Sequence, residues 1–169
     1  PGREGELCLR GATVFDGYFR EPELTRGAFD SDGYFRTGDL FVIAGDAPVP
    51  RFYQFVGRCK EIIIRGGQNI SPAEIDGLVE GHPAIAEAAC VGLPDEQMGE
   101  RVCLVAVPRA GASLALEDVT GFLRERHVAT YKWPERLVVA TALPRNPVGK
   151  VVRARLRSLV LGDGAGIGP

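Results

Sequence analysis

The sequence lacks a long apolar run and lacks a marked excess of charge of either sign. No apolar stretch reaches the ~18 residues that a membrane-spanning helix needs, and no signal peptide is visible. The formal net charge of -2 at pH 7 is not accompanied by a basic stripe with interleaved aromatic side chains. We therefore expect no transmembrane segment, no nucleic-acid partner and a cytoplasmic location.

Cysteine and histidine are scarce and show no ligand-like spacing. The four cysteines form no C-x-x-C pair, and neither histidine has neighbours that would complete a metal site. These residues are Cys8, Cys59, Cys90, Cys103, His82 and His127. We expect reduced cysteines, no disulfide framework and no metal ligands in this chain.

The first third of the chain is rich in glycine and in short strand-like runs, with turn signals at Asp32-Gly33 and Gly38-Asp39. The runs are residues 6–10, 34–36, 40–43 and 52–56. So short a segment buries too little surface to be stable alone, because even a ~60-residue domain is marginal. We interpret residues 1–57 as the β-rich end of a larger domain, and the missing initiator Met indicates the same.

From residue 58 the pattern changes to mixed α and β. Strands are predicted over 61–65, 85–92, 102–108 and 136–141, and helices over 72–80, 116–127 and about 150–160. The predicted fold class is α+β. It comprises a small domain over 58–160, with an antiparallel sheet and flanking helices, and a flexible tail over 161–169.

Short motifs then follow one another along most of the chain. They are GELCLRG (5–11), GY (17–18) with PE (22–23), DGYFRTGDL (32–40), GRCKEIIIRGGQNISPAEI (57–75), GLPD (92–95) with GE (99–100), YKWP (131–134) and LPRNPVGK (143–150). In this order and spacing they resemble the adenylate-forming superfamily of acyl-CoA synthetases, peptide-synthetase adenylation domains and luciferases. The chain is similar to the C-terminal portion of such enzymes.

The resemblance implies a two-step reaction that uses ATP with Mg²⁺ and coenzyme A. A carboxylic acid attacks ATP to give acyl-adenylate and pyrophosphate, and the thiol of coenzyme A then takes the acyl group. In the family a large N-terminal domain of the same chain carries most of the ATP and acid pockets. Its phosphate loop is absent here, and Gly149-Lys150 does not replace it because no upstream glycine has the required spacing. The Mg²⁺ site is therefore expected outside this chain, which alone should be inactive.

Two residues resemble the nucleotide contacts of the family, and a third resembles its hinge. Asp39 corresponds to the aspartate that accepts hydrogen bonds from the ATP ribose, and Arg58 to an arginine that contacts ribose or phosphate. Lys60 matches the hinge about which the small domain rotates between the two steps. Taken alone, Asp39 would indicate a turn aspartate and Arg58 a surface salt bridge.

Three further residues are assigned by the same resemblance. Lys150 corresponds to the catalytic lysine, whose ammonium stabilises the charge that develops when the carboxylate attacks the α-phosphate. Gly66 and Gly67 correspond to the loop that lines the pantetheine tunnel during thioester formation, where a side chain would block the thiol arm. Taken alone, the glycines indicate only a tight turn and Lys150 only a surface lysine.

Three functions remain open from the sequence. The leading one is an ATP-dependent acid–CoA ligase. The second is an adenylation domain that loads a carrier-protein phosphopantetheine, and the third is a non-catalytic binding module. The acid is not indicated, because its pocket belongs to the N-terminal domain.

Overall fold

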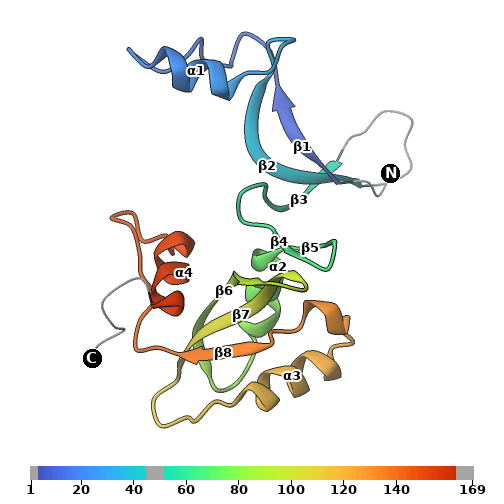
Figure 1. The fold of residues 1–169 in the computed structure, drawn as a ribbon, viewed down its shortest axis with the longest axis vertical. Helices are drawn as coiled ribbons and strands as arrows, with labels where there is room; N and C mark the ends of the chain where they lie inside the picture. Colours follow the sequence, from blue (N-terminus) through green and yellow to red (C-terminus); the bar gives the residue numbers. More distant parts are fainter. Residues whose placement is uncertain (1–3, 45–51, 163–169) are drawn as a thin grey trace. The chain divides into compact units, whose positions relative to one another are not determined.

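The computed structural model describes residues 4–44 and 52–162, and the chain separates into two compact units (Figure 1). The units are Pro1–Lys60 and Glu61–Pro169. The division therefore follows Lys60, whereas the sequence suggested a division after residue 57. Most of the predicted tail, residues 163–169, lies outside the described residues. The interpretation of residues 1–57 as part of a larger domain stays a prediction.

The first unit is a three-stranded antiparallel sheet with one short helix. Its elements are β1 Glu4–Leu9, α1 Pro22–Ala28, β2 Phe35–Ala44 and β3 Phe52–Arg58, in the order β1-β2-β3. The turn predicted at Gly38-Asp39 is wrong, because both residues lie inside β2. Gly38 has a φ of 72° where the register between β1 and β2 shifts, so it forms a β-bulge and the strand continues. The helix α1 was not predicted.

The first unit buries almost nothing of its own. Among its described residues only Gly57 is buried, and no large apolar side chain is. Phe19 is 85% exposed and Phe52 72% exposed. Sheets need an apolar face packed against another layer to be stable, and the described residues of this unit bury no such face.

The second unit is a mixed sheet with helices on both faces, which confirms the predicted α+β class. Its elements are β4 Ile63–Arg65, β5 Gln68–Ile70, α2 Pro72–Val79, β6 Ile85–Asp95, β7 Gly99–Pro108, α3 Leu116–Glu125, a 3-10 turn Thr130–Lys132, β8 Arg136–Val139 and α4 Arg153–Leu161. The order is β5-β4-β7-β6, and β8 also pairs with β7. The β7–β8 pair is parallel, unlike the predicted antiparallel sheet, because the chain returns to β8 through α3.

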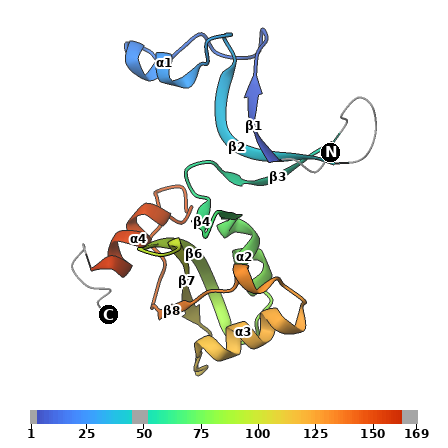
Figure 2. The same cartoon turned by 45° about the vertical axis from the view of Figure 1, so that its right-hand side comes forward.

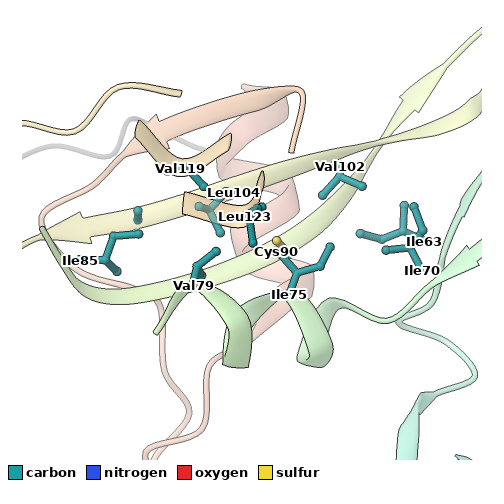
Figure 3. Packing of buried hydrophobic residues seen from close by; sticks show 11 residues of the cluster. Ile63, Ile70, Ile75, Val79, Ile85, Cys90, Val102, Leu104, Val119 and Leu123 are labelled. Atoms are coloured by element: carbon teal, nitrogen blue, oxygen red, sulfur yellow. The ribbon is translucent and has the colours of Figure 1, made fainter. Parts of the chain in front are cut away.

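Alternating residues of β6 and β7 build two separate cores on the two faces of this sheet. One face packs against α2 and α3 through Ile75, Val79, Val119 and Leu123 (Figure 3). The other face packs against α4, which Figures 1 and 2 show across the sheet from α3.

The two buried cysteines follow this division. Cys90 belongs to the core under α2 and α3, whereas Cys103 belongs to the core under α4. They therefore point to opposite faces of the sheet and cannot be joined by a disulfide. All four cysteines are free.

The helix α2 begins as the sequence predicted. The backbone N–H of Glu74 donates to Ser71 Oγ at 3.3 Å, and Pro72 stands at the first helical position. Of the helices in the described ranges, none has the length and apolarity needed to cross a membrane.

Candidate active site

The structure brings the two predicted nucleotide residues into contact. Asp39 of β2 and Arg58 of β3 are direct cross-strand partners, with 2.9 Å between Arg58 Nε and Asp39 Oδ1. The Arg58 guanidinium also donates to the carbonyl of Thr37 at 3.3 Å. The Asp39 side chain remains 34% exposed and that of Arg58 55%, so an external ligand can reach both. Their role in binding a nucleotide stays a prediction.

The backbone that carries Asp39 is fixed by side chains from two strands. Glu6 accepts a hydrogen bond from the Gly38 N–H at 3.0 Å and a forked pair from the Arg36 guanidinium. Thr37 Oγ1 donates to the carbonyl of Leu7 at 2.7 Å and accepts from the Asp39 N–H at 3.1 Å. The bulge is thus held in place independently of any ligand, which preorganises the Asp39 carboxylate.

Lys60 lies in an exposed turn at the end of the first unit. The preceding residue, Cys59, donates its N–H to the carbonyl of Gly38 at 2.8 Å. The chain therefore leaves the hydrogen-bonded sheet immediately before Lys60. This position suits a pivot, although the hinge role itself stays a prediction.

Gly66 and Gly67 form the two-residue turn between β4 and β5. Arg65 pairs with Gln68 across the turn, and the φ values of the glycines are 55° and 80°. Two positive φ values at the centre of a two-residue hairpin are typical of a type I′ turn, which glycine adopts without strain. A Cβ added at Gly67 meets no atom within 4 Å, whereas one at Gly66 would lie 2.7 Å from Met98 Cε. Gly67 thus faces open space.

Lys150 lies in a loop before α4 and not inside that helix. The helix was predicted from about residue 150 but begins at Arg153, because Arg145 and Val151 form an antiparallel bridge that keeps the chain extended. Asn146 Oδ1 accepts the N–H of Val148 at 3.2 Å and that of Lys150 at 2.8 Å. The exposed lysine is therefore presented by an ordered loop.

An ion pair fastens the Lys150 loop to the sheet. The Arg145 guanidinium donates to the carbonyl of Gly149 at 2.6 Å and to Glu87 Oε2 at 2.6 Å. Glu87 stands in β6, eight positions before Asp95 at the other end of that strand. At ~3.3 Å per residue, these two ends lie roughly 25 Å apart.

The Gly66–Gly67 turn is fastened at the Asp95 end by a second set of charges. Arg65 and Arg101 both contact the Glu135 carboxylate, and Arg101 also contacts Asp95. The hydrogen bonds from Arg65 are the main cause that holds the pKa of Glu135 below its ordinary value, and the Arg101 hydrogen bond does the same for the pKa of Asp95. Both carboxylates are thus stabilised in their charged form.

A third carboxylate is shifted in the opposite direction. Burial raises the pKa of Asp76 from 3.8 to about 6, even though Arg153 contacts it and the Cys90 N–H donates to it at 2.7 Å. Arg153 also approaches Glu61 at 3.6 Å. The start of the second unit, α2 and α4 are joined at this point.

Sequence reasoning missed the roles of Glu135, Arg101 and Arg153. Glu135 lies 34 positions from Arg101 and 70 positions from Arg65, and Arg153 lies 77 positions from Asp76, so no local motif signals these three contacts. Among the described residues, no group of three or more His, Cys, Asp or Glu side chains is arranged to hold a metal ion.

Comparison with known proteins shows which enzymes the chain is similar to. Residues 74–150 match the family model of the AMP-binding enzyme C-terminal domain. Over 93% of the chain, the fold is similar to ATP-bound MatB from Rhodopseudomonas palustris, with a TM-score of 0.80 and 35% sequence identity, and it covers 30% of that protein. In sequence and in fold, the chain is therefore similar to the C-terminal part of adenylate-forming enzymes.

In sequence, the chain is also similar to ligases of carboxylic acids. It is 43% identical over 164 residues to the medium-chain fatty-acid–CoA ligase of Escherichia coli strain K12. It is 40% identical over 165 residues to the salicyl-AMP ligase / salicyl-S-ArCP synthetase of Mycobacterium tuberculosis. These matches cover 95% and 97% of this chain but only 28% of the length of either relative.

Proposed function

We propose that this chain is the C-terminal part of an ATP-dependent acid–CoA ligase that forms an acyl-adenylate and then a thioester. The observation that carries the proposal is the likeness to such ligases, which extends over 95% of the chain and thus across both units. The substrates are a carboxylic acid, ATP and coenzyme A.

Asp39 and Arg58 bind the nucleotide in this proposal. A preorganised, partly exposed carboxylate can accept hydrogen bonds from the two ribose hydroxyls, and the adjacent guanidinium can donate to ribose or phosphate oxygens. The contact between the two side chains and the hydrogen bonds that fix the bulge support this assignment.

Lys150 supplies positive charge to adenylate formation, whereas the Gly66–Gly67 turn serves thioester formation. The two loops are fastened near opposite ends of β6, at Glu87 and at Asp95. A separation of this size supports a rotation about Lys60 between the two steps. The rotation would replace the Lys150 loop at the reaction site with the Gly66–Gly67 turn.

The first unit completes a larger N-terminal domain of the same chain. Its exposed apolar side chains and the lack of a buried core among its described residues support this, because such a sheet needs a further layer. The Mg²⁺ that accompanies ATP is then bound outside the present residues. We also infer a cytoplasmic location, which the four free cysteines support.

Replacing Lys150 in the full-length protein tests the proposal. An accepted acid is first found by pyrophosphate release with octanoate, salicylate and oxalate. Lys150→Ala should then lower pyrophosphate exchange by at least about 100-fold, since it removes a charge that acts in the transition state. Thioester formation from supplied acyl-adenylate should fall by less than about threefold.

Two control variants accompany Lys150→Ala. Lys150→Arg keeps the charge and should retain more exchange activity, and Arg155→Ala removes an exposed cation from α4 and should change neither step. Equal losses in both half-reactions would overturn the assignment of Lys150. A full-length protein that releases no pyrophosphate with any acid would overturn the function itself.

A second candidate function is loading of a carrier protein, which the likeness to the salicyl-S-ArCP synthetase favours. In that case the thiol acceptor is a protein-bound phosphopantetheine and not coenzyme A. Parallel thioester assays with coenzyme A and with a phosphopantetheinylated carrier protein distinguish the two.

A further inference from the structure

Glu135 is the centre of an ion network that joins three separate parts of the second unit. The Arg65 guanidinium donates to both of its carboxylate oxygens, at 3.0 Å and 2.8 Å, and Arg101 Nη1 donates to Oε1 at 3.0 Å. The side chains of Arg65 and Glu135 are only 21% and 26% exposed. A forked pair with this degree of burial defines an orientation much better than an exposed salt bridge does.

Glu135 itself stands on a rigid part of the fold. Its backbone N–H donates to the carbonyl of Val102 in β7 at 2.9 Å, and β8 starts at the next residue. Pro134 before it is buried. The backbone of Glu135 is thus anchored to the central strand of the sheet.

The β4–β5 hairpin, in contrast, is anchored in the core only at its base, where Ile63 and Ile70 are buried, and its turn end lies outside that core. Each of its strands has three residues, and at the turn end β4 pairs with β7 through Arg65 and Gly99, while the Ile64 N–H donates to Glu100 of β7 at 3.0 Å. A two-stranded hairpin of this length is marginal by itself. Arg65 directly precedes the Gly66–Gly67 turn, so the orientation of its backbone decides where the turn lies.

The tip of the β6–β7 hairpin supports the turn from a second side and uses the same network. The Gly66 N–H donates to the carbonyl of Met98 at 2.8 Å. Met98 is in turn placed by Asp95, whose Oδ1 accepts its N–H at 2.9 Å. The other oxygen of Asp95 pairs with Arg101, which also contacts Glu135.

We propose that Glu135 is a positioning residue for thioester formation, because it aligns Arg65 and Arg101 and thereby sets the position of the Gly66–Gly67 turn. The proposal rests on the proposed function, in which this turn lines the path of the coenzyme A thiol. Glu135 does not contact a substrate in this role. It acts through the two arginines.

The experiment compares Glu135→Gln with the full-length wild-type enzyme in both half-reactions. The substitution keeps the size of the side chain but removes the charge and one of the two acceptor oxygens. The kcat/KM for coenzyme A, measured with supplied acyl-adenylate, should fall about tenfold. Pyrophosphate exchange should stay within about twofold. Arg65→Gln should give the same pattern, and the double variant should lose no more than either single variant, since both remove one interaction.

Two matched variants separate positioning from a general loss of structure. Glu74→Gln breaks a 2.6 Å ion pair with Lys132 in the same unit, outside the network, and should leave both half-reactions unchanged. Glu87→Gln releases Arg145 at the other end of β6 and should slow pyrophosphate exchange while sparing thioester formation.

The outcomes are distinct. A selective loss of thioester formation in Glu135→Gln supports the proposal, whereas equal losses in both steps, or none in either, overturn it. If the wild-type enzyme makes acyl-adenylate but no thioester with coenzyme A, then coenzyme A is not the acyl acceptor. That result overturns the proposed function together with the positioning role. Normal wild-type turnover with an unaffected Glu135→Gln variant overturns only the positioning role.

Discussion

At the scale of single residues, Asp76 shows how burial outweighs pairing. Its carboxylate is in contact with Arg153 and accepts the Cys90 N–H, and both contacts favour the charged form. Desolvation is nevertheless the largest effect and raises its pKa to about 6. The residues next to Asp76 in the sequence do not reveal its ion pair, because its partner Arg153 lies 77 positions away.

This shift predicts a pH-dependent contribution of Asp76 to stability. The folded-state pKa is raised from 3.8 to about 6, so the folded chain binds the proton more tightly than the unfolded chain does. The contribution of Asp76 is therefore most favourable below pH 4 and is lost as pH rises to about 6. Over this window it should fall by up to about 3 kcal/mol.

Urea unfolding of the chain and of its Asp76→Asn variant between pH 4 and 7 measures this contribution. The difference in unfolding free energy, wild type minus variant, should decrease with pH, because the asparagine side chain of the variant does not titrate. Glu135 and Asp95, whose pKa values are lowered, titrate in both proteins and cancel. A difference that grows with pH would show that the Arg153 pairing dominates.

At the scale of elements, the β4–β5 hairpin combines a structural and a functional requirement at Gly67. A φ of 80° favours glycine whatever the function, whereas the open space around its Cβ position means that packing sets no limit on a side chain. Gly111 offers a matched position, with a φ of 74° and equally open surroundings in the loop after β7. The same substitution at Gly67 and at Gly111 therefore distinguishes the effect of backbone strain from the effect of a side chain that blocks the thiol arm.

We expect Gly67→Leu and Gly111→Leu to destabilise the protein by a similar amount, on the order of 1–2 kcal/mol each. In the full-length enzyme only Gly67→Leu should strongly reduce thioester formation with coenzyme A, and it should spare pyrophosphate exchange. Thermal unfolding and the two half-reaction assays check this. Unchanged turnover of coenzyme A by Gly67→Leu would count against the tunnel.

The elements themselves were largely predictable, but their pairing was not. The helix predicted over 72–80 formed over Pro72–Val79, and the strands β6 and β7 followed from their apolar runs. The strand β5 was missed because Gln68-Asn69-Ile70 has little strand propensity and pairs only through the type I′ turn. The start of α4 was misplaced because the bridge between Arg145 and Val151 keeps the chain extended as far as Val151.

At the scale of the whole molecule, the chain contains two units of different character. The second has two buried cores, whereas the first has no buried apolar side chain among its described residues. The family's phosphate loop is also absent from the sequence. Under the proposed function, catalysis should therefore require the N-terminal part of the full-length protein.

Pyrophosphate exchange by the 169-residue chain alone tests this expectation. With ATP, Mg²⁺ and an acid that the full-length enzyme accepts, the exchange rate should equal the background without protein. The full-length enzyme serves as the positive control, and circular dichroism confirms that the chain is folded. Exchange above background would mean that the catalytic site is not divided between this chain and an N-terminal domain.

The sequence by itself determined the resemblance to adenylate-forming enzymes, the α+β class and the candidate residues Asp39, Arg58 and Lys150, because short motifs and apolar periodicity are local properties. Only the tertiary structure decided which charges meet. It placed Asp39 beside Arg58 through strand register, and it gathered Arg65 and Arg101 around Glu135. The physical reason is that ion pairs depend on distances across the sheet, which residues far apart in the chain set together.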